Sequence, residues 1–298
     1  MRSFRSLLFV PGHKPGWPDK AAASGTDALI LDLEDSVPEA LKQQGRVLAA
    51  ETIDRLYSDT TTNVGVIVRP NALDTEHFGR DLEAVVRPGL EALLLPKIAE
   101  PADIHRFDGL LSHLEIRAGM ARGSVEVIPS LETAAGVANA ELLATASPRV
   151  ATLQSATARD GDIGREVGFV WSREGLETLH LRSKAVLACR ANGLDHPLCG
   201  VWQEISDLDG LKIFSEQNRS LGFRGQLVLH PSHVAVVNDI YAVSGDELSR
   251  AHRMIETFEQ ALTSGSASVM FEGEHIDVAH IKTARALLEL GSRQENAS

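Results

Sequence analysis

Charged side chains follow several short apolar runs of this 298-residue chain. Asp32, Glu34 and Asp35 lie at the end of the run Ala28–Leu33, and Arg69 follows Val64–Val68. Acids leaving an apolar run are costly unless cations or hydrogen-bond donors meet them. They could serve catalysis, or they could cap the next helix and pair with a nearby Lys or Arg. The guanidinium of Arg69 suits a bidentate carboxylate or an enolate oxygen, or a structural ion pair with these acids.

Four more charged residues occupy similar places. Lys97 follows Ala92–Leu95, where we favour a charge that orients acids or substrate over a Schiff-base role. Glu132 follows the fifth run, and Asp160 and Asp162 follow the sixth. Carboxylates from neighbouring strand ends are the hard oxygen ligands that Mg²⁺ prefers. Ordinary loop acids remain the alternative interpretation.

The histidines and cysteines do not form a recognisable metal or nucleophile motif. His230 and His233 have no third nitrogen ligand near them in sequence, so we interpret them as structural rather than zinc-binding. Cys189 and Cys199 form no CxxC pair and suit a reducing compartment. The sequence contains no Gly-x-Ser-x-Gly or HExxH motif.

The elements that must position these residues alternate regularly between short apolar runs and amphipathic segments. Continuous apolar runs are typical of strands covered on both faces. Eight such units predict a closed parallel (β/α)8 TIM barrel, and the absence of GxGxxG after the first run disfavours a doubly wound sheet. The runs are Leu7–Val10, Ala28–Leu33, Val64–Val68, Ala92–Leu95, Val125–Ile128, Val150–Leu153, the weak Cys199–Val201, and Gln226–Leu229.

Two helix starts carry capping signals. Ser36–Glu39 reads as a capping box with proline in the first turn, and Ser244–Glu247 reads as a second capping box. We therefore expect the barrel to occupy residues 1–245 and a C-terminal helical extension to occupy 246–298.

Charge and hydropathy restrict the partners. The formal net charge is −12, which argues against nucleic acid or an anionic membrane as the main partner. No apolar stretch is long enough to span a bilayer, and Leu7–Val10 is too short for a signal peptide's apolar region. We expect a cytoplasmic protein with a small-molecule substrate.

Taken together, these stretches resemble the citrate lyase beta-subunit-like family of the HpcH/HpaI aldolase/citrate lyase superfamily, which includes malyl-CoA and citramalyl-CoA lyases. The resemblance implies a (β/α)8 barrel assembled as a homotrimer or homohexamer. It also implies Mg²⁺ held by Glu132 and an aspartate after the sixth strand. The matching stretches run in the family's order: Arg5–Gly12, Leu31–Val37, Val68–Asn71, Leu95–Lys97, Ile128–Thr133, Leu221–Phe223, His230–Ser232 and Gly273–Asp277.

The resemblance also assigns roles. Arg69 would hold substrate and stabilise the developing enolate, with Glu132 and Lys97 as further substrate-binding residues. Asp277 would be an acid/base residue delivered by the C-terminal extension into a neighbouring subunit's site.

The chain departs from the family pattern after the sixth run, in Gln154–Gly164. Without a gap, Arg159 falls on the metal position, where its cation would repel Mg²⁺. A shift of one residue places Asp160 there, and Asp162 matches a later family aspartate. We choose Asp160, with Asp162 as the alternative. Gln226 stands where a lysine is common, which would alter how substrate is held.

The expected activity is Mg²⁺-dependent cleavage or formation of a carbon–carbon bond. The substrate would be a small 3-hydroxyacyl-CoA such as malyl-CoA, citramalyl-CoA or citryl-CoA, giving a 2-oxo acid and an acyl-CoA. Four alternatives stay open: a CoA-independent aldolase on 2-oxo-4-hydroxy acids, an acyl-CoA thioesterase, a subunit of a larger acyl-carrier complex, and a catalytically weakened member.

Overall fold

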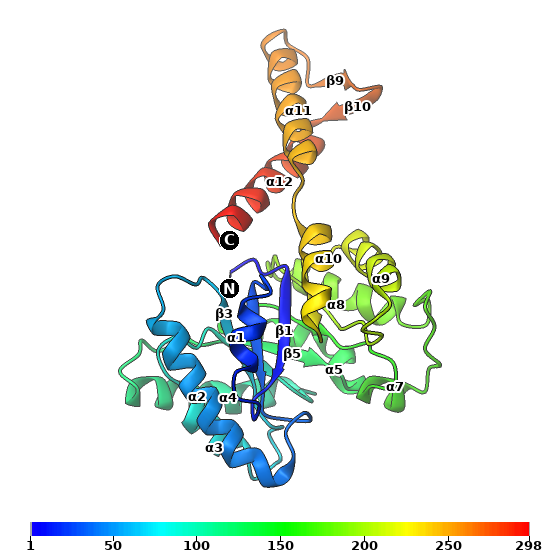
Figure 1. Cartoon of the computed structure of the whole chain (residues 1–298). Helices are drawn as coiled ribbons and strands as arrows, with labels where there is room; N and C mark the ends of the chain where they lie inside the picture. Colours follow the sequence, from blue (N-terminus) through cyan, green and yellow to red (C-terminus); the bar gives the residue numbers. More distant parts are fainter. Residues whose placement is uncertain (1, 298) are drawn as a thin grey trace. The chain divides into compact units, whose positions relative to one another are not determined.

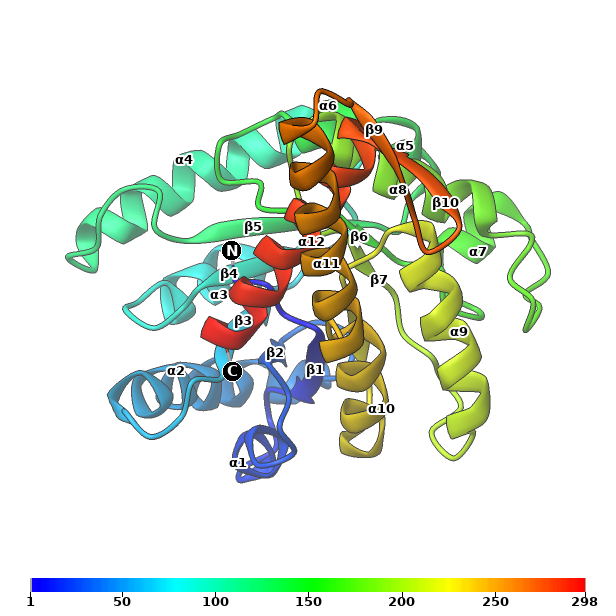
Figure 2. The same cartoon turned by 90° about the horizontal axis from the view of Figure 1, so that it is seen from above.

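Eight parallel strands close into a barrel, as the sequence predicts. The computed structural model describes residues 2–297, with side chains as far as Gln294. Each strand pairs with the next, and β1 pairs with β8 to complete the ring (Figures 1 and 2). The strands are β1 (Ser6–Pro11), β2 (Ala28–Asp32), β3 (Gly65–Arg69), β4 (Ala92–Leu95), β5 (Glu126–Leu131), β6 (Gln154–Ser155), β7 (Leu198–Cys199) and β8 (Gly225–Val228).

Helices surround the strands (Figure 2). They are α1 (Trp17–Ala22), the short 3₁₀ turn η1 (Glu39–Leu41), α2 (Lys42–Ser58), α3 (Phe78–Val85), α4 (Pro101–Arg117), α5 (Ala134–Ala138), α6 (Ala140–Ala144), α7 (Asp162–Val167), α8 (Leu179–Ala191), α9 (Leu208–Leu221) and α10 (Pro231–Tyr241).

The apolar runs are continuous because both faces of each strand are buried. Leu7, Ile30, Ile67 and Ile128 belong to a cluster inside the barrel. Residues in the other phase, such as Leu29, pack with the helices in a larger outer cluster. Successive side chains of a strand point to opposite faces, so one run supplies both cores.

Two predicted boundaries are shifted. The sixth run, Val150–Leu153, lies just before β6, because Val150 makes only an isolated bridge to Val127 before the ladder continues. Ser36 does not cap α2. Its backbone N–H instead donates to Asp32 Oδ2 at 3.1 Å, and the 3₁₀ turn separates it from the helix. The backbone of Ser36 is therefore held by the Asp32 carboxylate, and Ser36 does not form the helix cap that the sequence pattern predicts.

A second compact unit begins at Ala242, four residues before the boundary expected from the sequence. It contains α11 (Gly245–Thr263), the antiparallel pair β9 (Ser268–Phe271) and β10 (Glu274–Asp277), and α12 (Val278–Ala297) (Figure 1). The predicted capping box at Ser244 and Glu247 is confirmed. Met254, Phe258 and Ile276 belong to this unit's own core.

Across residues 2–297, no helix combines the length and the apolar character that a membrane crossing requires.

A buried ion-pair network supports the N-terminal end of β5. Arg149 donates to Glu115 through both terminal nitrogens, at 2.7 and 2.6 Å, and to Asp108 at 2.6 Å. Glu115 also accepts the backbone N–H groups of Gly123 and Val125, both at 2.8 Å. Burial raises the pKa of Glu115, but the hydrogen bonds from Arg149 and these amides outweigh it and hold the pKa below its usual value.

We predict that Glu115→Gln lowers the free energy of unfolding by about 3 kcal/mol, because Arg149 loses a buried partner. A carboxyl with a depressed folded-state pKa stabilises the fold above its unfolded pKa, and that contribution disappears as the pH falls through the folded pKa. Urea titrations from pH 7 to pH 3 should therefore show a shallower acid-side loss of stability in the variant.

Glu216→Gln is the matched control. Glu216 pairs with Lys212 at 3.9 Å on the exposed face of α9. Its loss should change stability by less than about 0.5 kcal/mol. Equal effects of the two substitutions would contradict the importance of the buried network.

Candidate active site

A cavity of about 520 Å³ opens at the C-terminal ends of the barrel strands, where (β/α)8 enzymes build their sites. Its wall combines apolar side chains with acids and one guanidinium. The lining residues are Phe9, Pro11, Trp17, Asp32, Asp35, Ser36, Arg69, Leu94, Ser130, Glu132, Gln154, Ala156, Ala158, Gly161, Asp162, Gly200, Val201, Gln203, Leu227 and Leu229.

Strand alternation aims the charged residues into this cavity. Ile30 and Ile67 face the barrel interior, and two positions later Asp32 and Arg69 keep the same phase. Asp32 and Arg69 are also partners in the β2–β3 register. Two adjacent strands therefore present opposite charges side by side at the mouth.

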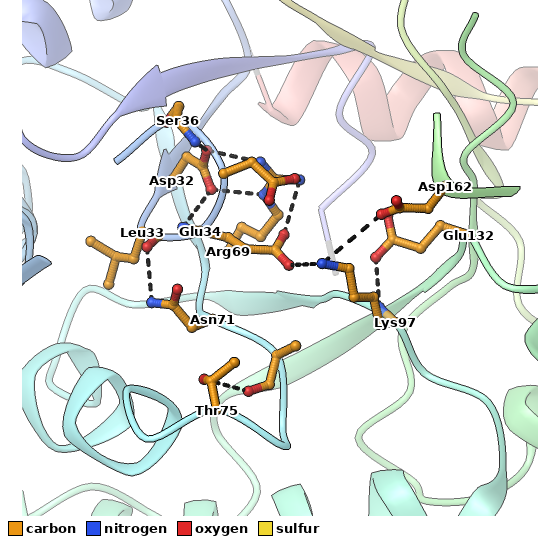
Figure 3. Close-up of polar contacts among 12 residues, drawn as sticks. Asp32, Leu33, Glu34, Ser36, Arg69, Asn71, Thr75, Lys97, Glu132 and Asp162 are labelled. Carbon is orange, nitrogen blue, oxygen red and sulfur yellow. Dashed lines mark hydrogen bonds and ion pairs between the residues drawn. The ribbon is translucent and has the colours of Figure 1, made fainter. Parts of the chain in front are cut away.

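Asp32 and Arg69 form a bidentate ion pair. Arg69 Nε donates to Asp32 Oδ1 at 2.7 Å, and Nη2 donates to Oδ2 at 2.8 Å (Figure 3). The side chain of Asp32 is 2% exposed and that of Arg69 is 17% exposed. Burial raises the pKa of Asp32, but Arg69 and the N–H groups of Ser36 and Glu34 outweigh it and lower the pKa. Both groups are thus ionised, and the guanidinium is fixed in one orientation.

Glu34 lies between two cations. Its Oε1 accepts a hydrogen bond from Lys97 Nζ at 2.9 Å, and its Oε2 lies 3.2 Å from Arg69 Nη1. Oε2 is buried and makes no hydrogen bond of good geometry within the described part of the chain. Burial raises the pKa of Glu34 despite these cations, so an additional positive group is favoured here.

Lys97 reaches the site through an uncommon backbone conformation. Its φ of 54° is left-handed, which is rare for a residue with a side chain. That turn lets the backbone N–H of Lys97 donate to Glu132 Oε1 at 2.6 Å while the side chain pairs with Glu34. Local strain of this kind is typical of functional loops.

The pKa of the Glu132 carboxyl is strongly perturbed in the cavity. Burial and the nearby Glu34 and Asp162 charges raise the pKa of Glu132 to about 7, although Lys97 N–H and Arg69 oppose the shift. A carboxyl with this environment would be stabilised by another cation.

The structure brings Asp162, rather than Asp160, to the cavity with Glu132. Asp162 begins α7, lines the cavity and lies 3.9 Å from Lys97 Nζ. The Asp160 side chain is 94% exposed, its backbone φ is 56°, and it does not contribute to the cavity wall formed by the described residues.

Arg159 does not enter the cavity wall of the described chain either. Its Nη1 donates to Glu204 Oε1 at 2.9 Å, and its guanidinium lies 5.4 Å from the centre of the Trp171 ring. These contacts hold the cation against Glu204 and Trp171, outside the residues that line the cavity.

The chemistry of the wall fits a divalent cation. Asp32, Glu34, Asp35, Glu132 and Asp162 are met by Arg69, Lys97 and Arg165, which donates to Asp162, so an excess of two negative charges remains when all are ionised. Glu132 and Asp162 form no ion pair with Arg69, and the Arg165 that pairs with Asp162 is exposed, so these two acids are the residues that could hold a metal. Within residues 2–297, the trio of ligand groups already gathered closely enough for a metal lies elsewhere, at Glu39, Glu76 and His77.

The remaining predicted residues lie outside the cavity. Asp277 ends β10 in the C-terminal unit, where hydrogen bonds from His280 and the N–H of Ala279 lower the pKa of its carboxyl. His233 is buried against Ile205 O at 3.2 Å. The exposed His230 contacts Ser232 at 2.8 Å.

Gln226 faces away from the substrate cavity. It lies in the outward phase of β8 and accepts from Tyr241 OH at 3.5 Å. Its replacement of a lysine therefore changes the layer between β8 and α10 rather than the cavity wall.

Sequence reasoning missed the polar residues that support the acids. Lys42 contacts the loop after β2 but was not singled out. The signal was present: Lys42 and Arg46 share the helix face of Ala49 and Ile53, which is buried. Cations at 3.6-residue spacing on an apolar face predict buried polar partners.

Comparison with known proteins gives one consistent answer. Residues 5–231 match the family described as HpcH/HpaI aldolase/citrate lyase. The chain is 33% identical over 288 residues to a (3S)-malyl-CoA thioesterase of Cereibacter sphaeroides, covering 96% of this chain and 93% of that protein. It is 30% identical to an L-malyl-CoA/beta-methylmalyl-CoA lyase of Rhodobacter capsulatus, covering 95% and 93%.

A solved structure agrees. The protein CitE from Mycobacterium tuberculosis, in complex with magnesium, acetoacetate and coenzyme A, is 28% identical and covers 96% of this chain and 97% of its own, with a TM-score of 0.72. Because the family model matches residues 5–231 and the architecture is shared, this chain belongs to the HpcH/HpaI aldolase/citrate lyase family.

Proposed function

We propose that this protein is a Mg²⁺-dependent lyase that cleaves, or in reverse forms, the carbon–carbon bond of a small 3-hydroxyacyl-CoA. One observation carries the proposal: Arg69, fixed by Asp32, shares a cavity with the acid pair Glu132 and Asp162. Relatives that act on malyl-CoA and a neighbour crystallised with magnesium and coenzyme A support the substrate class.

Glu132 and Asp162 are the proposed metal ligands. Bound there, Mg²⁺ would neutralise part of the carboxylate excess and polarise substrate oxygens. Lys97 lies beside both acids and orients Glu132 through its backbone N–H. Its ammonium also balances Glu34, so it organises the acids rather than acting as a nucleophile.

Arg69 supplies the charge stabilisation. Two of its five N–H donors are committed to Asp32 and Nη1 faces Glu34 Oε2 at 3.2 Å, so a substrate carboxylate or enolate oxygen would share the Nη edge with Glu34. When the hydroxyl proton leaves, the bond between the hydroxyl-bearing carbon and the thioester's α-carbon breaks. The products are a 2-oxo acid and an acyl-CoA enolate, and the enolate carbon then takes up a proton. A guanidinium that is already oriented stabilises this charge without reorganisation.

Thioester hydrolysis is the second candidate, because a relative 33% identical over nearly the whole chain is named a (3S)-malyl-CoA thioesterase. The same cavity would then present the thioester carbonyl to water, and Arg69 would face an oxyanion instead of an enolate.

Product analysis separates the candidates. Purified protein with Mg²⁺ is incubated with malyl-CoA, citramalyl-CoA and citryl-CoA, and separately with free 2-oxo-4-hydroxy acids. A lyase releases a 2-oxo acid and acyl-CoA without free thiol, whereas a thioesterase releases thiol without a 2-oxo acid. Turnover restricted to the free acids would identify a CoA-independent aldolase and refute the lyase proposal.

We predict that Glu132→Gln and Asp162→Asn each weaken Mg²⁺ binding by at least about tenfold, because each removes a hard anionic ligand. Calorimetric titration of Mg²⁺ in the presence of a 2-oxo acid measures the change. Asp160→Asn is the matched control, since its exposed side chain lies outside the cavity wall. A large loss in Asp160→Asn with normal binding in Asp162→Asn would reverse the assignment.

Asp277 is proposed as the acid/base residue, supplied by the C-terminal unit to a neighbouring subunit of a homotrimer or homohexamer. Its lowered pKa makes it a weak base until His280 releases it. We predict that Asp277→Ala abolishes turnover and that mixing it with Arg69→Ala restores part of it, because mixed oligomers contain some sites with both residues intact. Activity measured after subunit exchange, with the oligomer size checked by light scattering, tests this. Properly mixed oligomers that stay inactive would rule out a shared site.

A further inference from the structure

Lys42 connects the loops that carry the site's charges. Lys42 is 8% exposed at the start of α2. The ammonium donates to Leu33 O and Glu34 O, both at 2.7 Å, and to Asn71 Oδ1 at 2.6 Å. Leu33 and Glu34 follow Asp32, and Asn71 follows Arg69 by two residues.

Asn71 extends this contact into the helix layer. Its Nδ2 donates to Leu33 O at 2.9 Å, as drawn in Figure 3, and to Asp81 Oδ2 at 2.6 Å. Its backbone N–H also donates to Asp81 Oδ2, at 2.8 Å. Arg46 Nη1 donates to Asp81 Oδ1 at 3.1 Å. The network thus joins β2, β3, α2 and α3 beneath the ion pair.

The number of donors shows what Lys42 does. An ammonium has three N–H groups, and all three are used by protein oxygens. None is left for substrate, so the residue acts on the site through the main chain. The two carbonyls that it holds fix the turn from which the Asp32 and Glu34 carboxylates approach Arg69.

We propose that Lys42 is a positioning residue, which sets the geometry of the Asp32–Arg69–Glu34 group by holding the β2 and β3 loops at a fixed spacing. The catalytic consequence rests on the proposed function, whereas the geometric claim does not. An Arg69 guanidinium aligned in this way stabilises the negative charge that develops on the enolate without moving. A misplaced guanidinium would have to reorient before it could do so.

The site of Lys42 is reachable by small molecules. A second cavity, of about 460 Å³, is bordered by Lys42, Asn71, Glu34, Asp35 and Lys97. Truncation of Lys42 would extend this cavity toward the three oxygen acceptors. A small alkylammonium ion can then take the place of the missing ammonium and restore the hydrogen bonds.

The experiment uses Lys42→Ala and Lys42→Met in the full-length protein, with Lys212→Ala, at an exposed position of α9, as control. The first readout is the ¹⁵N NMR signal of the Arg69 Nε–H group, identified by its loss in Arg69→Lys. This signal reports the ion pair between Arg69 and Asp32 and requires no catalytic activity. The second is the split of kcat from KM, together with Mg²⁺ affinity.

We expect the Arg69 Nε–H signal to shift or broaden in both Lys42 variants and to stay unchanged in Lys212→Ala. In Lys42→Ala, ethylammonium should restore it, whereas tetramethylammonium, which has no N–H donor, should not. The kcat should fall roughly 10- to 100-fold, as for other residues that orient a site's contacting groups. Mg²⁺ affinity should stay within about twofold of wild type, since Glu132 follows β5 and Asp162 begins α7, and neither contacts Lys42.

An unchanged Arg69 signal in folded Lys42→Met, or a signal in Lys42→Ala that ethylammonium does not restore, overturns the proposal. If Lys42→Ala does not fold, Lys42→Met decides the signal test, because its side chain fills the same volume. Wild-type protein with an intact signal but no turnover on any acyl-CoA would refute the proposed function and leave the Lys42 result standing.

Discussion

The bidentate ion pair between Asp32 and Arg69 is the interaction on which the site depends. Both side chains are nearly buried at the end of adjacent strands, where an unpaired charge would carry a large desolvation penalty. The β2–β3 register sets the two residues opposite each other, so folding of the barrel already covers the loss of backbone entropy that bringing them together requires. Arg69 lines the cavity while Asp32 fixes its orientation, so this structural contact also supplies a preorganised electrostatic group.

The remaining charges follow from an imbalance around that pair. Glu34 and Asp35 lie close to a guanidinium that Asp32 already holds, and Lys97 compensates only part of the excess. The raised pKa of Glu132 comes first from burial of its carboxyl and then from the neighbouring Glu34 and Asp162 charges. A site with this charge distribution favours a divalent cation, and a polarising cation beside a fixed guanidinium suits reactions that pass through an enolate or oxyanion.

The loop after β6 shows how neighbouring charged residues can be directed to different surroundings. Arg159 is held by Glu204 and Trp171, away from the cavity, while the following helix α7 begins with Asp162 at the wall. The ambiguity in the sequence arose because three charged residues occur within four positions. Side-chain direction, rather than sequence order, distinguishes them.

The sequence by itself determined the barrel, most strand positions and the charged residues at the strand ends. A strand buried on both faces cannot alternate apolar with polar residues, so a continuous apolar run predicts a barrel strand. Asp32 and Arg69 follow the inward-facing positions of their strands, which directs their side chains to the cavity. Tertiary structure alone decided three features: which of the acids holds Arg69, the orientation of Asp160 and Asp162, and the contacts of Lys42. Each depends on a contact between residues far apart in sequence or on one backbone turn, such as the left-handed φ of Asp160 and Lys97. A local pattern carries no information about which distant group meets a side chain, because closing the barrel creates those contacts.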